Sequence, residues 1–219
     1  MITNLKLLTQ LKSSKEELTF FSKSFVLTII GKPGSGKTSV VQEILLNEEL
    51  LQNKFDYIFI FSPTPLPYIE CVENENWIRD FSLEKIFFII ETLNGIDIEE
   101  FKNVLFIFDD LVGGMHKESG NEKLSRLFFN RRHLLKNASL SYVVITQRYI
   151  AIPTNIRSCI SHLIFFRLTQ RDYHSLKHDL VGYVDFAIIA KSITNDYDFI
   201  CMALDNGLIY KNFSERIII

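Results

Sequence analysis

The stretch GKPGSGKT at residues 31–38 constrains the fold of this 219-residue chain more than any other feature. A glycine, four residues and then Gly-Lys-Thr make up the complete phosphate-binding loop pattern. Glycines suit such a loop because the backbone must curl tightly and point successive N–H groups at phosphate oxygens. The apolar run FVLTII precedes the loop, and a segment with helical spacing follows it, so bound phosphates would lie at a helix N-terminus. This context disfavours the alternative, a glycine-rich turn without a ligand.

The loop pattern assigns chemistry to individual side chains. Lys37 is expected to reach the β- and γ-phosphates of a nucleotide, and the Thr38 hydroxyl is expected to bind Mg²⁺. The residues expected to hold the cofactor ATP are Gly31, Pro33, Gly34, Ser35, Gly36, Lys37, Thr38 and Ser39.

Apolar segments alternate with helical ones along the chain. Runs rich in β-branched and aromatic residues predict strands at 25–30, 57–63, 86–90, 104–110, 142–147 and 162–167. Helical spacing falls at 37–51, 94–102, 121–137 and, in two pieces around Gly182, at 169–192. Because unbroken apolar strands suit a sheet buried on both faces, we predict an α/β fold with a mostly parallel central sheet covered by helices. Such folds bind ligands at the carboxyl ends of their strands.

The end of the chain follows a different pattern. Two apolar runs, 198–204 and 207–213, flank Asp205-Asn206-Gly207, which is a tight-turn signal. We therefore expect an antiparallel hairpin within 198–219 at one edge of the sheet. No linker or repeat divides the sequence, so residues 1–219 are interpreted as a single ATPase domain with an N-terminal extension over 1–24.

Composition limits the expected partners and compartment. Lys and Arg number 24 against 26 Asp and Glu, so DNA contact would need a local patch or a pore built by several subunits. Cys71, Cys159 and Cys201 lack metal-site spacing, which favours a reducing compartment. No apolar run is long enough for a membrane span and the N-terminus lacks a secretory pattern, so an intracellular, soluble protein is expected.

Two acids end the strand predicted at VLFIFDD. Asp109 is expected to lie at the Mg²⁺ held by Thr38, and Asp110 to polarise an attacking water. Paired carboxylates at the end of a buried strand are costly unless a metal or a proton compensates them. A strand that simply enters solvent is the alternative. The second acid favours hydrolysis that drives a motor, because a transferase has no need to activate water.

The run YVVITQ ends in Thr146 and Gln147. If this strand lies next to the strand that ends in Asp109, the Gln147 amide can reach the γ-phosphate or the water and report which nucleotide is bound. The alternative role of Gln147 is to cap the strand end by ordinary hydrogen bonds.

The ordered set GKPGSGKT, VLFIFDD, FFNRRHLLKNASLSYVVITQR and IPTNIRSCISHLIFFRLT resembles the packaging ATPases of large DNA viruses, virophages and related elements. These belong to the FtsK/HerA superfamily of DNA-pumping motors, and the chain is similar to their poxvirus type. The resemblance runs from about residue 24 to the C-terminus and implies a RecA-like ASCE P-loop fold. The family's loop, acidic pair and polar sensor match Lys37, Thr38, Asp109, Asp110 and Gln147. No nuclease accompanies these motifs, so a motor subunit is expected rather than a complete terminase.

The resemblance also implies partners and a location. It implies ATP and Mg²⁺ as cofactors, double-stranded DNA as the cargo, and a homo-oligomeric ring that is a pentamer or hexamer. Capsid or portal-vertex proteins would be further partners. The expected location is the host cytoplasm or a viral factory, or the virion.

A ring ATPase normally supplies a cation across the subunit boundary to stabilise charge on the transferred phosphate. Arg157 is the first candidate, because FtsK-like motors carry a polar, often basic segment before their final core strand; a plain surface role is its alternative. Arg132 is the second candidate, and Arg148 is a third. His133 is interpreted as a buried hydrogen-bonding residue rather than a proton carrier.

Two further segments bear on DNA contact and on packing against the sheet. Residues 113–123, GGMHKESGNEK, are expected to form a loop in which Lys117 and Lys123 touch DNA phosphates or simply face solvent. Trp77 is expected to anchor a helix on the sheet.

Two other functions compete with a translocating motor. A small-molecule kinase on the same fold would want a lid of clustered arginines, and none stands out in the sequence. A nucleotide switch that binds partners without pumping is the other alternative. The cofactor that the resemblance implies is ATP, so adenine is the expected base.

Overall fold

The computed structural model describes residues 20–21, 23–64, 76–96, 103–136, 138–180 and 186–218. Most of the expected N-terminal extension lies outside these residues, as do Cys71 and 97–102. Within the described part of the chain, no helix combines the length and apolar character needed to cross a membrane.

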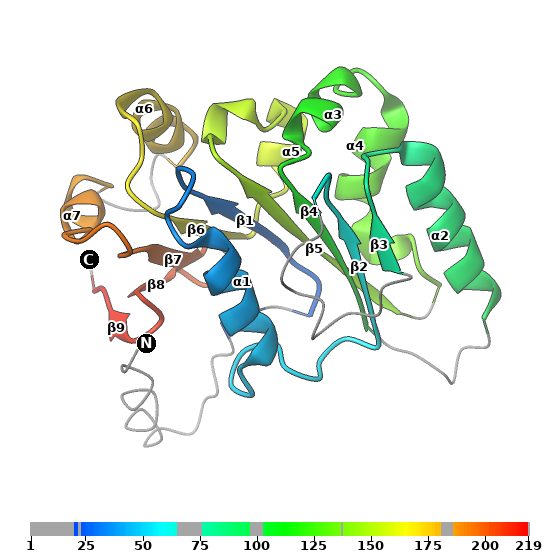
Figure 1. Cartoon of the computed structure of the whole chain (residues 1–219), viewed down its shortest axis with the longest axis horizontal. Helices are drawn as coiled ribbons and strands as arrows, with labels where there is room; N and C mark the ends of the chain where they lie inside the picture. The colour runs from blue at the N-terminus through cyan, green and yellow to red at the C-terminus, as the bar shows by residue number, and fades with distance from the viewer. Residues whose placement is uncertain are drawn as a thin grey trace.

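A nine-stranded sheet forms the centre of the molecule, in the order β3-β2-β4-β5-β1-β6-β7-β8-β9 (Figure 1). The mutually parallel strands are β1 (Val26–Ile30), β2 (Tyr57–Phe61), β3 (Trp77–Ile78), β4 (Asn103–Asp109), β5 (Ser139–Thr146) and β6 (His162–Phe165). The antiparallel strands at the other edge are β7 (Ile200–Ala203), β8 (Leu208–Lys211) and β9 (Glu215–Arg216). The predicted parallel sheet and C-terminal hairpin are therefore confirmed.

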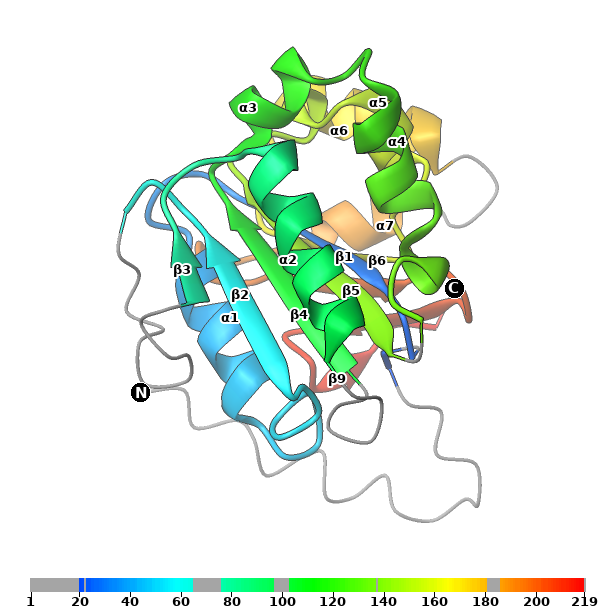
Figure 2. The ribbon, with the colours of Figure 1, turned by 90° about the vertical axis from the view of Figure 1, so that its right-hand side faces the viewer.

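Helices cover both faces of the sheet, with α1 (Lys37–Leu46) on one face and α2 (Leu83–Gly95) and α4 (Glu122–Phe129) on the other (Figure 2). Side chains alternate between two hydrophobic clusters, so that Phe106 and Phe108 of β4 join the α2 side while Leu105 and Ile107 join the α1 side. This double burial explains the continuous apolar runs in the sequence. The remaining helices are α3 (Val112–Lys117), η4 (Arg131–His133), η5 (Tyr149–Ala151), α5 (Thr154–Arg157), α6 (Gln170–Asp179) and α7 (Phe186–Lys191).

The strand predicted at 86–90 is wrong, because IFFII lies in the middle of α2. The residues of α2 that face the core are Leu83, Ile86, Ile90 and Leu93, which have the spacing of one helix face. The Ser82 side chain caps the helix by accepting a hydrogen bond from Lys85 N–H. Phe88, which is 69% exposed, lies off the buried face. A helix with apolar residues around most of its circumference resembles a buried strand over five positions, and only the longer period separates the two.

Trp77 lies in the short edge strand β3 and packs against the hydrophobic cluster that includes the buried residues of α1, and its indole N–H donates to the Ser62 carbonyl at 3.1 Å. Two other local expectations need correction. Residues 113–123 are not one loop, since α3 ends at Lys117 and α4 begins at Glu122. His133 is exposed, so the buried role expected for it is wrong.

A buried histidine ties the segment before β1 to β6. His162 Nε2 lies 2.7 Å from the Phe20 carbonyl oxygen, and its Nδ1 lies 2.9 Å from the Ser161 hydroxyl. A carbonyl can only accept, so Nε2 carries the proton and Nδ1 accepts from Ser161. The rings of Phe20, Phe21 and Phe25 pack around the imidazole. Burial lowers the pKa of His162, and the bond to Phe20 and the charge of Asp205 oppose that shift only in part.

This histidine should make stability depend on pH. The folded pKa lies below that of the unfolded chain, so the unfolded state takes up the proton first, and stability falls as pH drops below about 6.5. The slope from this group is at most about 1.4 kcal/mol per pH unit. The free energy of unfolding, measured in urea at pH 7.5 and 5.5, should change less with pH in His162→Gln than in the unmodified chain. His116→Gln, at an exposed site, should keep the slope of the unmodified chain. Equal slopes in all three proteins would contradict the assignment.

Candidate nucleotide-binding and hydrolysis site

The phosphate-binding loop begins where β1 ends, at the centre of the sheet. Gly31 N–H donates to the Thr146 carbonyl of β5 at 3.2 Å, which fixes the start of the loop. A Cβ at Gly31 would lie 2.8 Å from the Phe166 ring, so this approach requires glycine. Gly34 and Gly36 have φ of +76° and +98°, and Gly36 is the N-cap of α1. The loop therefore delivers the first N–H groups of α1, which have no partner within the helix, to the carboxyl edge of the sheet.

Lys37 lies across this loop. Its ammonium donates to the carbonyls of Gly31 at 2.8 Å and Lys32 at 2.9 Å. Burial lowers the pKa of Lys37, while the charges of Asp109 and Asp110 oppose the shift. The ammonium is thus held between the loop and the acidic pair, where a phosphate would meet it.

The acidic pair follows β4. Burial first, and then the charge of Asp110, raises the pKa of Asp109 to about 6, although Lys37 lowers it. A carboxylate that is costly to ionise in this setting would be stabilised by a cation. Asp109 and the Thr38 hydroxyl are both oxygen ligands, which suits Mg²⁺ when phosphate oxygens and water complete its shell. Elsewhere in the described ranges, no cluster of three or more His, Cys, Asp or Glu side chains offers a different metal site.

Asp110 has a left-handed backbone, with φ of +54°, which is unusual for a residue other than glycine. Its N–H donates to the Ile145 carbonyl of β5 at 3.1 Å, so the sheet holds the turn in place. The Gln147 amide Nε2 lies 3.4 Å from the Asp110 carboxylate. Strain of this kind costs about 1–3 kcal/mol and clusters at functional sites. The structure thus brings Asp110 and Gln147 together at the strand ends, both exposed to solvent.

A mostly apolar pocket of about 390 Å³ adjoins the loop, and no motif in the sequence indicates it. Gly36, Ser39 and Val40 line one side. The other side is lined by Phe166, Tyr197, Phe199 and Phe213. Tyr197 is 72% exposed, which leaves a ring face accessible beside the loop. The aromatic residues come from segments read in the sequence only as strands and their ends, so nothing but the folded sheet edge brings them to α1.

A polar network fixes the wall of this pocket. Asp198 accepts hydrogen bonds from the backbone N–H groups of Thr194 and Asn195 and forms an ion pair with Lys211 at 2.9 Å. Although burial raises it, these bonds hold the pKa of Asp198 well below its usual range. Asn212 and Phe213 have left-handed φ values of 52° and 59°. The wall is therefore held by several polar contacts and includes two residues with a left-handed backbone.

The candidate arginines lie in different places. Arg157 is 19% exposed and pairs with Asp179 at 2.8 Å, while also donating to Thr154 and lying over the Tyr149 ring. Arg148 follows Gln147 and lies 3.7 Å from the Asp172 carboxylate. Arg132 is exposed, and the structure gives it no ion pair with any described residue. Its neighbour Arg131 reaches the carbonyl of Ser24, before β1, so Arg132 lies at the amino edge of the sheet, opposite Asp110.

A family model described as Poxvirus A32 protein matches residues 12–194 of the sequence. The chain belongs to the Poxvirus A32 protein family. This confirms the resemblance to viral packaging ATPases that the motifs predicted. Comparison with curated protein sequences gives no match for this A32-family protein.

Solved structures with the same fold include the DNA-packaging ATPase B204 from Sulfolobus Turreted Icosahedral Virus. It has a TM-score of 0.60 and 15% identity, over 87% of this chain and 98% of that one. The genome packaging NTPase B204 from Sulfolobus turreted icosahedral virus 2 in complex with AMP has a TM-score of 0.63 and 13% identity, over 90% and 100%. The pCW3 conjugation coupling protein TcpA with ATPgS has a TM-score of 0.58 and 14% identity, over 89% and 60%. At these identities the likeness establishes the fold of the A32-family protein.

Substitutions in the A32-family protein should separate binding from hydrolysis. Lys37→Ala should weaken nucleotide binding, because it removes the ammonium from the loop. Asp110→Asn should leave nucleotide bound but slow turnover about 10² to 10⁴-fold if the carboxylate positions or deprotonates water. Nucleotide titration and steady-state turnover measure the two effects. Asp80→Asn changes an exposed carboxylate far from the loop and serves as the control. Unchanged turnover in Asp110→Asn would remove Asp110 from the mechanism.

Proposed function

We propose that this A32-family protein is the subunit of an ATP-driven motor that moves double-stranded viral DNA into a capsid. One observation carries the proposal: strand β5, which Gln147 directly follows, lies between the strand of the phosphate-binding loop and the strand of the acidic pair. The loop, the acids and the polar sensor therefore share one edge. Packaging ATPase structures with the same fold support the cargo, and those solved with ATP analogues support the nucleotide.

Each side chain of the site has its own role in hydrolysis. Lys37 binds the β- and γ-phosphates, and the N–H groups at the start of α1 bind phosphate oxygens. Thr38 and Asp109 hold Mg²⁺, which neutralises charge on the phosphates when bound. Asp110 accepts a hydrogen bond from the attacking water and orients it, and Gln147 holds the same water or the γ-phosphate from the adjacent strand. The Asp110–Gln147 pair favours water as the acceptor, which supports an ATPase over a small-molecule kinase.

The apolar pocket beside Gly36 has the size and lining of a nucleobase site. The exposed face of Tyr197 would stack on the base, and Phe166 and Phe213 would enclose it. Adenine, rather than guanine, is the base that we propose for this pocket.

A ring arrangement would complete the site. Arg157 is held within its own subunit by Asp179, so it is a poor donor to a neighbour. Arg132 is free of ion pairs in the described part of the chain and lies at the edge opposite its own Asp110, so any phosphate that it reaches belongs to another subunit. We therefore place Arg132 before Arg157 as the arginine that acts in trans. A pentameric or hexameric ring, contact with capsid or portal-vertex proteins, and a location in the cytoplasm, viral factory or virion stay part of the proposal.

ATP turnover measured with and without double-stranded DNA, on protein of known oligomeric state, tests the motor. The rate should rise with DNA, and specific activity should rise with protein concentration as rings form. Turnover strictly proportional to concentration down to a demonstrated monomer, and unaffected by DNA, would contradict a translocating ring.

Mixing two inactive variants tests the trans arginine. Arg132→Ala should lower the rate about 10³-fold or more while nucleotide stays bound. Subunits with Asp110→Asn supply an intact Arg132, and subunits with Arg132→Ala supply an intact Asp110, so mixed rings contain complete sites and should regain activity. If the mixture stays as inactive as its parents although both variants assemble, Arg132 does not act across the boundary. The same mixture with Arg157→Ala in place of Arg132→Ala serves as the comparison.

A further inference from the structure

A buried carboxylate outside the hydrolysis site holds the turn that carries Gln147. Asp172 lies in the first turn of α6 and is only 1% exposed. Its Oδ1 accepts from the Ile150 N–H at 3.2 Å, and its Oδ2 accepts from the Thr169 hydroxyl and lies 3.7 Å from Arg148 Nε. Arg148 and Ile150 come one and three residues after Gln147. The carboxylate thus joins α6 to the backbone just beyond the sensor residue.

A helix cap alone does not explain this arrangement. Thr169 caps α6 by accepting from the Asp172 N–H at 3.2 Å, and the T-x-x-D spacing resembles a capping box. In a capping box the acid returns to the backbone N–H of the cap residue, which needs no contact with another segment. In this structure Oδ2 accepts from the Thr169 hydroxyl instead of the Thr169 N–H, and Oδ1 accepts from Ile150 in the turn after β5. Burying a carboxylate costs several kcal/mol unless donors satisfy it, so these donors and the acid depend on each other.

The turn needs such support because the Gln147 side chain is weakly held. Gln147 is exposed, and its bond to Asp110 is long, at 3.4 Å. The position of its amide therefore depends on the backbone that carries it. Thr146 Oγ1 accepts from the Arg148 N–H at 3.3 Å, which links the end of β5 to the residue that Asp172 contacts.

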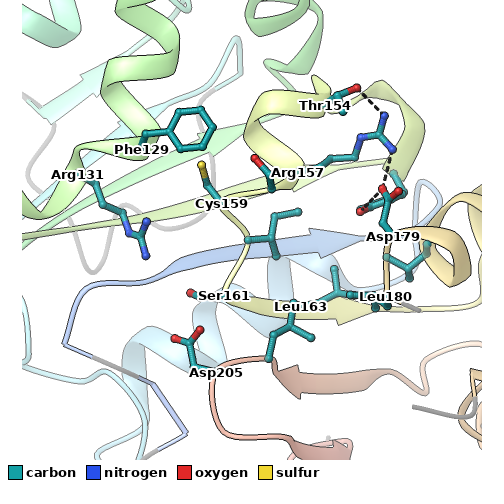
Figure 3. Close-up of a pocket in the computed structure, with 15 residues that line it drawn as sticks. Phe129, Arg131, Thr154, Arg157, Cys159, Ser161, Leu163, Asp179, Leu180 and Asp205 are labelled. Atoms are coloured by element: carbon teal, nitrogen blue, oxygen red, sulfur yellow. Dashed lines mark hydrogen bonds and ion pairs between the residues drawn. The ribbon is translucent and has the colours of Figure 1, made fainter. Parts of the chain in front are cut away.

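A second attachment lies seven residues further along α6, on the same helix face. Asp179 accepts from the Tyr149 hydroxyl at 2.8 Å and from Arg157 at 2.8 Å. Figure 3 shows Arg157 between Thr154 and Asp179, at the rim of a cavity of about 550 Å³. The segment after Gln147 is therefore fixed to α6 at two points, and Asp172 is the one next to the sensor.

We propose that Asp172 is a positioning residue for ATP hydrolysis, which holds the turn from Thr146 to Ile150 so that the Gln147 amide faces Asp110. This inference rests on the proposed function of Gln147 and Asp110. Asp172 does not touch nucleotide or water and acts only through Gln147.

The variant Asp172→Asn keeps the shape of the side chain and removes its charge. Turnover should fall about 10- to 100-fold, because a displacement of about 1 Å at a reacting group has effects of this size. The dissociation constant of ATPγS should stay within about twofold, because Asp172 lies outside the loop and the base pocket. Ser82→Ala removes the cap of α2, far from this turn, and should lower stability without changing turnover.

A double variant separates positioning from general destabilisation. In a Gln147→Ala background, Asp172→Asn should cause no further loss of turnover, because its effect passes through the missing amide. An additional 10-fold loss in that background would overturn the inference. Arg148→Gln, at an exposed side chain, weakens the same contact with less risk to folding and should show the same dependence on Gln147.

Amide hydrogen exchange keeps the test independent of the proposed function. Exchange across 146–151 should be faster in Asp172→Asn than in the unmodified chain, and unchanged in Ser82→Ala. If the unmodified chain hydrolyses no ATP, the proposed function fails, while exchange still decides whether Asp172 holds the turn. Unchanged exchange, or unchanged turnover in Asp172→Asn of an active protein, would contradict the positioning role.

Discussion

Strand β5 is the constraint on which the rest of the structure depends. Its last residues accept two backbone hydrogen bonds from different sides: Gly31, which starts the phosphate-binding loop, donates to Thr146, and Asp110 donates to Ile145. In parallel pairing, Ile30 lies opposite Thr146, and Asp109 lies opposite Ile145. A slip of one residue in either pairing would move the loop or the acids by about 3.3 Å and turn alternate side chains to the other face. The register of three strands therefore sets the geometry of the hydrolysis site.

The site contains several energetically unfavourable features, and the packing of the core offsets them. Asp110 has a left-handed backbone, Asp109 has a pKa raised to about 6, and Lys37 has a pKa lowered by burial. The last two features are unfavourable in the protein alone, and a bound Mg²⁺-nucleotide would offset them, because cation and phosphate would supply charges of opposite sign. The buried strands β1, β4 and β5 lie directly beneath and hold the groups in place. We expect nucleotide binding to stabilise the fold for the same reason.

The sequence predicted those parts of the molecule that local chemistry determines. The loop, the acidic pair and the T-Q strand end each have a short pattern with one physical purpose, and the alternation of strands and helices predicted the sheet. The strand predicted at IFFII was wrong because five apolar residues in a row do not distinguish a helix with apolar residues around most of its circumference from a strand. The loop expected over 113–123 was wrong because short polar segments take their structure from the elements that they pack against.

Other features could not be predicted because they depend on residues that are distant in sequence. In the sequence, the spacing of Thr169 and Asp172 indicates only a helix cap. The contact between Asp172 and the turn after Gln147 depends on the packing of α6 against η5. Tyr197 and Phe213 become neighbours of Gly36 only when the last strands extend the sheet beyond β6. Likewise, the sequence ranked Arg157 before Arg132, whereas the pairing of Arg157 with Asp179 exists only in the folded chain.

The most direct test of this account is a crystal structure of the protein with Mg²⁺, ADP and aluminium fluoride as the transferred phosphate. The account predicts the fluoride group within about 3 Å of Lys37 Nζ, a water between it and the Asp110 carboxylate, and the Gln147 amide within hydrogen-bond distance of either. It also predicts Mg²⁺ bound by Thr38 with Asp109 beside it. A nucleotide bound in the loop with Asp110 and Gln147 both turned away from the fluoride group would contradict the claim that the ends of three strands form one hydrolysis site.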